Sequence, residues 1–183
     1  MNTSQNSYDL NSDPQSDNSL ISLGGKASGW LSPLHVAARK GHDQIVRMLL
    51  QHNVDCEDKD SNGLAPLIHA VIGGHETVVR SLLSLGARIC NGDGQQCSSA
   101  LHLAARHRRG NLLRILLDHC LRERTSIDCS DEMGKTPLHV AVDIGFEMGV
   151  YILLQSGANP NYRVFQPLEK KDILDQNRID ASG

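Results

Sequence analysis

The feature that most constrains this 183-residue chain is a short segment that occurs four times. The copies are Ser32–Ala38, Ala65–Val71, Ser99–Ala105 and Thr136–Val142. In each copy, an apolar run ends fifteen residues after the fourth position, at Leu50, Leu83, Leu117 and Leu154. The distance from there to the second position of the next copy varies, at 16, 17 and 20 residues. Constant spacing within copies and variable spacing between them indicate stacked helical units joined by loops that can accept insertions.

Each copy predicts a pair of helices, as the first one illustrates. Ser32 can cap a helix whose first turn holds Pro33, where a missing N–H costs nothing. Ala37 leaves room for a closely packed neighbour, and Gly41 suits a turn that ends the helix. The run Ile45–Leu50 has the apolar spacing of a second, outer helix. We therefore expect an inner and an outer helix in every copy.

The four segments resemble the ankyrin repeat, whose mark is Thr-Pro-Leu-His-x-Ala, as in Thr136–Ala141. The resemblance covers about Trp30 to Asn161. It implies an all-α fold, an ankyrin-repeat solenoid of four helix-turn-helix repeats with short connecting hairpin loops. The expected domain is 29–162, with repeats at about 29–58, 62–91, 96–129 and 133–162.

Departures from the repeat pattern predict local differences. Arg108 replaces the turn glycine of the other copies, which implies backbone strain of about 1 kcal/mol or a different turn. Trp30 and Cys97 occupy a loop position that is glycine in the second and fourth copies, so those two loops should differ. The third outer helix is expected to continue through Leu121–Arg124, which would explain the longest gap.

The two flanks differ from the repeats in composition. Residues 1–28 are polar, with no Lys or Arg before Lys26, and we expect them to be disordered. In the tail 163–183, Gln166–Glu169 echoes a helix start, but 30 residues after Pro137 and followed by lysines. A partial capping repeat over the fourth repeat and a frayed end are both compatible with this tail.

The sequence offers no catalytic, cofactor or metal site. His35, His102 and His139 hold the repeat's own histidine position, where the resemblance implies a hydrogen bond to a neighbouring loop. The nine histidines show no zinc-binding spacing, and no phosphate-binding glycine loop is present. Five cysteines without a Cys-x-x-Cys pair argue against a disulfide framework and fit a reducing compartment. Cys56 and Cys129, which recur at one repeat position, are expected to pack within loops.

Composition also bounds where the protein acts. No signal peptide or apolar stretch of about 20 residues is evident, so an intracellular protein without membrane contact is expected. A net charge of -3 gives no general reason to bind nucleic acid. We expect a monomer that is not an enzyme.

By resemblance, partners bind the concave face that loop tips and inner helices form. Mapped onto this chain, the expected partner-binding residues are Arg39, Lys40, Lys59, Asn62, Leu64, Ile72, Gln95, Arg106, His107, Met133, Lys135, Asp143 and Ile144. Leu64, Ile72, Met133 and Ile144 are predicted to be exposed apolar groups between basic spots. An apolar patch rimmed by charge suits a protein partner better than nucleic acid. Ordinary solvated surface is the alternative.

Three stretches resemble a narrower group, the fungal transcription regulators that combine a basic region with ankyrin repeats. They are Trp30–His35, Ile45–Cys56 and His69–Glu76. The resemblance implies a nuclear regulator or co-regulator whose partner is a transcription factor. This sequence has no basic region, so the protein would be either a co-regulator that acts through a partner or a truncated relative of the group. A cytoplasmic adaptor that brings substrates to a ubiquitin ligase is the rival hypothesis.

Overall fold

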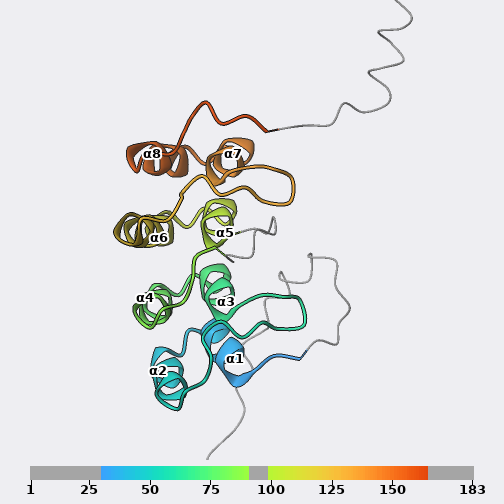
Figure 1. Ribbon diagram of the computed structural model, residues 1–183, viewed down its shortest axis with the longest axis vertical. Helices are drawn as coiled ribbons and strands as arrows, with labels where there is room; N and C mark the ends of the chain where they lie inside the picture. Colours follow the sequence, from blue (N-terminus) through green and yellow to red (C-terminus); the bar gives the residue numbers. More distant parts are fainter. Residues whose placement is uncertain (1–29, 91–98, 165–183) are drawn as a thin grey trace, which may run out of the picture.

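The computed structural model describes residues 30–90 and 99–164, which form eight helices in two columns (Figure 1). The inner column contains α1 (Pro33–Lys40), α3 (Pro66–Gly73), α5 (Ala100–Arg106) and α7 (Pro137–Asp143). The outer column contains α2 (Asp43–Gln51), α4 (Glu76–Ser84), α6 (Gly110–Glu123) and α8 (Glu147–Gln155). Each helix contacts its pair partner and the next helix of its own column. The prediction of an all-α solenoid of four helix-turn-helix repeats is confirmed.

The inner helices begin as the sequence predicts. Ser32 and Thr136 are extended N-cap residues, each followed by proline in the first helical turn. The Ser32 hydroxyl lies 2.7 Å from Nδ1 of His35, and the Thr136 hydroxyl accepts a hydrogen bond from the His139 N–H at 3.4 Å. The cap and the histidine three residues later therefore satisfy each other's polar groups at the helix start.

The turns between inner and outer helices require left-handed backbone. Gly41 and Gly74 have φ of 78° and 81°, a region that glycine enters without steric cost. Arg108 adopts the same region with φ of 54°, so the turn is retained and the strain falls on a residue with a side chain. Its guanidinium donates a hydrogen bond to the Ile144 carbonyl of the next repeat.

Stacking buries equivalent side chains in successive layers. Leu34, Leu67, Leu101 and Leu138 stand at one position of the four repeats and are at most 8% exposed. They belong to one apolar cluster that runs the length of the described stack. The outer helix α6 extends to Glu123, and Arg124 ends it in a left-handed conformation, which confirms the predicted extension.

The two ends of the stack expose positions that are buried inside it. Val142 is 60% exposed, whereas Val71 at the same position of the second repeat is fully buried. At the other end, Ile45 is 43% exposed while its equivalent Val78 is fully buried. The predictions for residues 1–28, for Cys97 and for most of the tail 163–183 fall outside the described residues.

Candidate partner-binding surface

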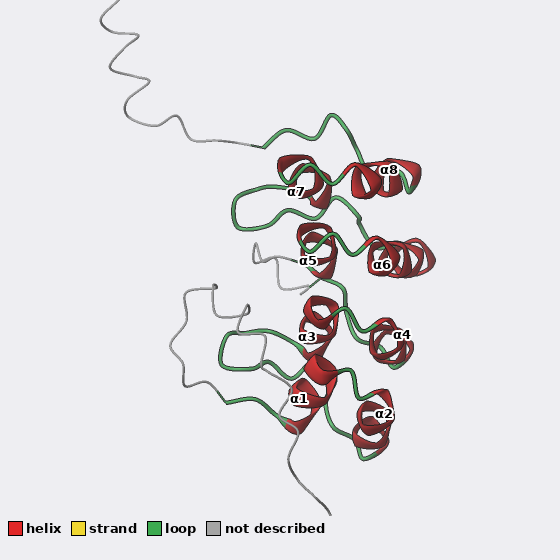
Figure 2. Cartoon of the chain, turned by 180° about the vertical axis from the view of Figure 1, so that it is seen from behind, coloured by secondary structure: helices red, strands yellow, loops and turns green. Residues whose placement is uncertain are grey.

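Hairpin loops project from the side of the stack that carries the inner helices (Figures 1 and 2). We call the loops together with the exposed parts of α1, α3, α5 and α7 the loop-side surface. It is the surface on which the sequence places the expected partner-binding residues.

A buried aspartate shapes the loop between the first two repeats. The Asp60 carboxylate accepts hydrogen bonds from the backbone N–H groups of Asn62 and Leu64, at 2.8 and 2.9 Å. The Asp60 N–H donates to the Leu64 carbonyl at 3.0 Å, and Nε2 of His35 lies 3.0 Å from the same oxygen. Gly63, with φ of 74°, closes the turn. The Asp60 carboxylate, which lies in the loop itself, and His35, which lies in the preceding inner helix α1, thus hold the loop in a single conformation.

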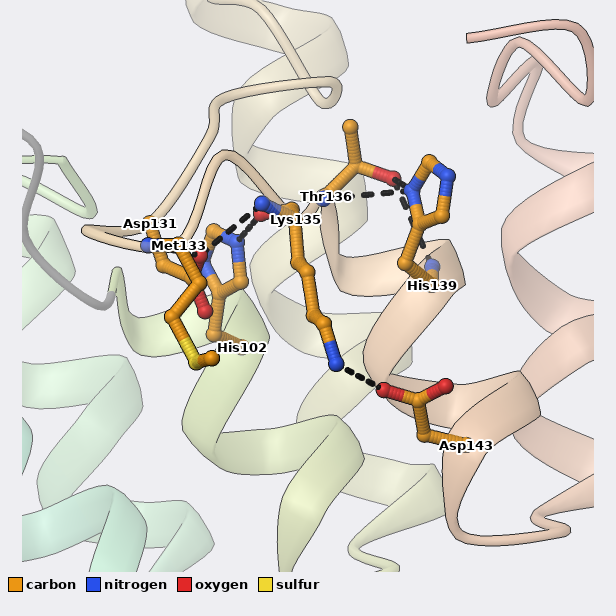
Figure 3. A network of polar contacts seen from close by, with 7 residues as sticks. All are labelled: His102, Asp131, Met133, Lys135, Thr136, His139 and Asp143. Atoms are coloured by element: carbon orange, nitrogen blue, oxygen red, sulfur yellow. Dashed lines mark hydrogen bonds and ion pairs between the residues drawn. The ribbon is translucent and has the colours of Figure 1, made fainter. Parts of the chain in front are cut away.

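The fourth repeat uses the same design (Figure 3). Asp131 accepts from the N–H groups of Met133 and Lys135, both at 2.9 Å. Nε2 of His102 lies 2.8 Å from the Lys135 carbonyl. The structural role expected for His35 and His102 is therefore present: each histidine fixes the loop of the repeat that follows.

His69, which the repeat pattern left without a role, pairs with the same loop. Its Nε2 lies 2.9 Å from the Asp60 carboxylate, and its ring packs edge-on against His35. Burial lowers the pKa of His69 and outweighs the opposing effect of Asp60. Burial alone would raise the pKa of Asp60, but the hydrogen bonds from Leu64, His69 and Asn62 outweigh it and lower that pKa. The pair is therefore a neutral imidazole beside a carboxylate near neutral pH.

The C-terminal ends of the inner helices form a row across the stack, in which Arg106 and Asp143 are exposed and the other two residues are half-buried. Arg39, Ile72, Arg106 and Asp143 hold one position in the four successive repeats. Lys40 and His107 follow Arg39 and Arg106, and both are exposed. The first three repeats therefore present cationic side chains on either side of an isoleucine.

The prediction of four exposed apolar groups is wrong for three of them. Leu64, Ile72 and Ile144 are half-buried, because each packs against the apolar core of the stack. Met133 alone of the four is exposed, at 69%, on the loop before α7. The loop-side surface is thus more polar than the sequence suggested.

The remaining expected residues have different surroundings. Lys59 and Asn62 are exposed on the first described loop, and Gln95 lies outside the described residues. Lys135 forms an ion pair with Asp143 at 2.5 Å, so these two side chains neutralise each other at the fourth repeat. Burial, Arg109 and Arg106 lower the pKa of His107, which is therefore mostly neutral at neutral pH.

Asp60 and Asp131 are residues that the sequence alone did not single out. Each stands three residues before a loop glycine and six before the helix proline. That shared spacing was a usable signal, since an aspartate a few residues before a turn glycine favours a turn in which its carboxylate accepts hydrogen bonds from the following backbone N–H groups. Both are less than 5% exposed.

The chain matches the protein family described as "Ankyrin repeats (3 copies)" over residues 11–93 and 89–164. It belongs to the ankyrin-repeat family. Ankyrin repeats bind protein partners and generally act as interaction modules. The buried histidines and aspartates of this ankyrin domain are structural groups that hold its hairpin loops in shape.

Several relatives share this ankyrin region. The p105 subunit of nuclear factor NF-kappa-B from Gallus gallus is 31% identical over 151 residues, which are 80% of this chain and 15% of the relative. The E3 ubiquitin-protein ligase XBAT32 from Arabidopsis thaliana is 34% identical over 151 residues, 70% of this chain and 30% of the relative. The B-cell lymphoma 3 protein homolog from Mus musculus is 38% identical over 61 residues, 33% of this chain and 14% of the relative. The chain thus spans a minor part of each relative.

Two further observations bear on what the ankyrin domain can bind. Within residues 30–90 and 99–164, no three His, Cys, Asp or Glu side chains converge as a metal ion would require. No helix in the same two segments is long and apolar enough to cross a membrane. The buried aspartates and histidines hydrogen-bond to the loop backbone, while Lys40 and Arg106 are exposed to solvent. Such an arrangement is suited to binding another macromolecule.

Proposed function

We propose that this ankyrin domain regulates transcription by binding a protein partner, such as a transcription factor, across the loop-side surface. The observation that carries the proposal is the row in which Arg39 and Arg106 flank Ile72, with Lys40 and His107 beside them. The loops next to this row are held by buried aspartates, so binding requires little ordering of the backbone.

The charge of the row suggests the chemistry of the partner. Arginine is favoured at interfaces because its planar guanidinium pairs with carboxylates and packs on apolar groups. In the fourth repeat, Lys135 and Asp143 already pair, so attraction should be strongest over repeats one to three. We expect the partner to offer an acidic segment with an apolar side chain for Ile72 or Met133. A short, interrupted basic row suits such a segment better than a nucleic-acid backbone.

Similarity to the p105 subunit of nuclear factor NF-kappa-B supports a nuclear, transcriptional setting. Nuclear localisation and kinship with the fungal basic-region regulators are narrower parts of the same proposal. The full proposed surface comprises Arg39, Lys40, Lys59, Asn62, Leu64, Ile72, Gln95, Arg106, His107, Met133, Lys135, Asp143 and Ile144.

A second candidate function is recruitment of substrates to a ubiquitin ligase. The similarity to XBAT32, an E3 ubiquitin-protein ligase by name, favours it. Both functions use the same kind of protein-binding surface, and they differ in the identity of the partner.

A charge-reversal experiment tests the proposal. The double variant Arg39→Glu/Arg106→Glu changes two loop-side residues, and Arg80→Glu/Arg114→Glu makes the same charge change on the exposed faces of α4 and α6. Each full-length chain is used to capture proteins from nuclear extract, and the proteins recovered by the wild type are identified by mass spectrometry. Thermal melting verifies that both variants fold.

We expect a transcription factor to be recovered by the wild type and by the control, but not by the loop-side variant. Binding of that purified protein should weaken at least tenfold in the loop-side variant, which corresponds to about 1.4 kcal/mol. Recovery of a ubiquitin-ligase subunit instead would favour the second function. Equal recovery by all three chains would show that the loop-side surface does not bind the partner.

A further inference from the structure

Two cysteines from different repeats are in contact beside the start of α5, the inner helix of the third repeat. Cys90 lies at the end of the segment that follows α4, and Cys129 lies on the connection after α6. Their Sγ atoms are 3.3 Å apart, although 39 residues separate them along the chain. Both side chains are half-buried, and both are free thiols.

Neighbouring groups fix this contact in place. Cys129 Sγ lies 3.3 Å from the hydroxyl of Ser99, the N-cap residue of α5. The Ser99 hydroxyl in turn lies 2.8 Å from Nδ1 of His102. On the other side, the Ala100 N–H donates to the Ile89 carbonyl at 3.1 Å, which anchors the residue before Cys90. The start of α5 thus holds both sulfur-bearing segments.

We propose that Cys90 and Cys129 form a covalent modification site, a dithiol that hydrogen peroxide oxidises to a disulfide. The sulfurs need to move about 1.3 Å closer to reach the S–S bond length of about 2.0 Å. Neither cysteine lies in a helix, so rotation of the two side chains and small backbone shifts can supply this movement.

The environment favours Cys129 as the thiol that reacts first. The hydrogen bond that Cys90 donates lowers the pKa of Cys129 and, with smaller effects from His102 and Ser99, outweighs the opposing effect of burial. The same hydrogen bond, reinforced by burial, raises the pKa of Cys90. Because the thiolate is the reactive form of cysteine, Cys129 is the nucleophile and Cys90 the resolving thiol.

The chemistry balances with peroxide as the oxidant. The Cys129 thiolate attacks one peroxide oxygen, the O–O bond breaks, and hydroxide leaves and is protonated to water, which gives a sulfenic acid. The Cys90 sulfur then attacks the Cys129 sulfur, and the hydroxyl of the sulfenic acid departs as a second water. Two thiols lose two electrons and two protons, and one peroxide is reduced to two waters.

The disulfide would close a ring around the helices of the third repeat, α5 and α6. Closing a ring of this length restricts the unfolded chain much more than the folded one. Oxidation should therefore stabilise the stack without adding a contact on the loop-side surface. This site is separate from the row of Arg39, Ile72 and Arg106 that carries the proposed function.

Peptide mapping tests the linkage directly. The full chain is reduced, freed of reductant, treated with hydrogen peroxide, alkylated with iodoacetamide and digested with trypsin without reduction. The expected product joins peptides 89–106 and 125–135. Peptide 89–106 also contains Cys97, so the experiment is run in a Cys97→Ser background. The Cys56→Ser change in that background is the matched control, since Cys56 is another half-buried loop cysteine whose Sγ faces the Leu85 carbonyl rather than a second thiol.

We expect the cross-linked pair in the background and control chains, and its loss in Cys90→Ser and in Cys129→Ser. Dimedone, which traps sulfenic acids, should label peptide 125–135 in the Cys90→Ser chain. A cross-link to the peptide of Cys120 or Cys56, or alkylated Cys90 and Cys129 after peroxide, would overturn the proposal. Dimedone labelling confined to peptide 89–106 would overturn the order of the two steps.

Melting temperature gives an independent readout. Oxidation should raise Tm of the Cys97→Ser chain by about 10 °C, and dithiothreitol should reverse the rise. The Cys129→Ser chain should melt at the same temperature before and after peroxide. An unchanged or lower Tm in the chain that carries the cross-link would contradict the inferred stabilisation.

Discussion

Among single residues, Asp60 and Asp131 hold the described hairpin loops in shape. Each accepts two backbone N–H groups from a position that is almost fully buried. A hydrogen bond to a charged buried acceptor is worth more than a neutral one at the surface, and its loss leaves a donor without a partner.

We therefore predict that Asp131→Ala lowers the free energy of unfolding by about 2–4 kcal/mol. Asp131→Asn should recover most of the loss, because the amide oxygen can accept the same N–H groups of Met133 and Lys135. Asp118→Ala, an exposed change on α6, serves as the control. Urea denaturation measures all three variants, and equal stability of the alanine and asparagine variants would show that the hydrogen bonds are unimportant.

The pH dependence of stability should depend on His69. Burial lowers the pKa of His69 in the folded protein, so the unfolded chain takes up this proton at higher pH than the folded chain. The contribution to stability is then complete above about pH 6.5 and declines as the pH falls below that value. Urea denaturation at about pH 7.5 and about pH 5.5 should show a smaller decline for His69→Gln than for the wild type. Identical declines would mean that His69 titrates normally in the folded protein.

Among elements, the inner-to-outer turns offer a matched pair of substitutions. Arg108 and Gly145 hold the same position in the third and fourth repeats, with φ of 54° and 61°. Arg108→Gly should stabilise the protein by about 0.5–1 kcal/mol, because the strain exceeds the value of an exposed hydrogen bond to Ile144. Gly145→Arg should destabilise it by a similar amount, since a Cβ there meets only the strain and no neighbouring atom. Chemical denaturation decides the sign, and a loss of stability in Arg108→Gly would show that the hydrogen bond matters more.

The elements also show how far the sequence could predict the structure. Helix pairs and turn glycines followed from repetition, because a constant spacing reports packing that every repeat shares. The long α6 followed instead from the longest gap between two copies. Exposure was harder to predict: Leu64, Ile72 and Ile144 are half-buried because they pack against the apolar core, and such packing is set by the three-dimensional arrangement rather than by position in the repeat pattern. The contact between Cys90 and Cys129 was also missed, because it joins different positions of different repeats and has no periodic signal.

In the whole molecule, stability comes from burial between neighbouring repeats. A repeat inside the stack is covered on both sides, whereas the first and last described repeats are each covered on one. Val71 and Val142 illustrate the consequence, since they hold one repeat position and are fully buried and 60% exposed, respectively. Burial at equivalent positions thus depends on place in the stack rather than on residue type.

This dependence predicts very different losses of stability for the same substitution at two equivalent positions. Val71→Asp should cost about 3 kcal/mol or more, because it places an unpaired carboxylate between α3 and its neighbours. Val142→Asp should cost less than about 0.5 kcal/mol, because the carboxylate stays in water. Guanidinium denaturation of both variants measures the difference. Val71→Ala and Val142→Ala serve as controls, because they separate the loss of apolar contacts from the cost of the charge. If Val142→Asp lowers the free energy of unfolding nearly as much as Val71→Asp, another part of the protein must cover this end of the stack. In that case, the amides of α7 and α8 would be protected from hydrogen exchange as strongly as those of α3 and α4.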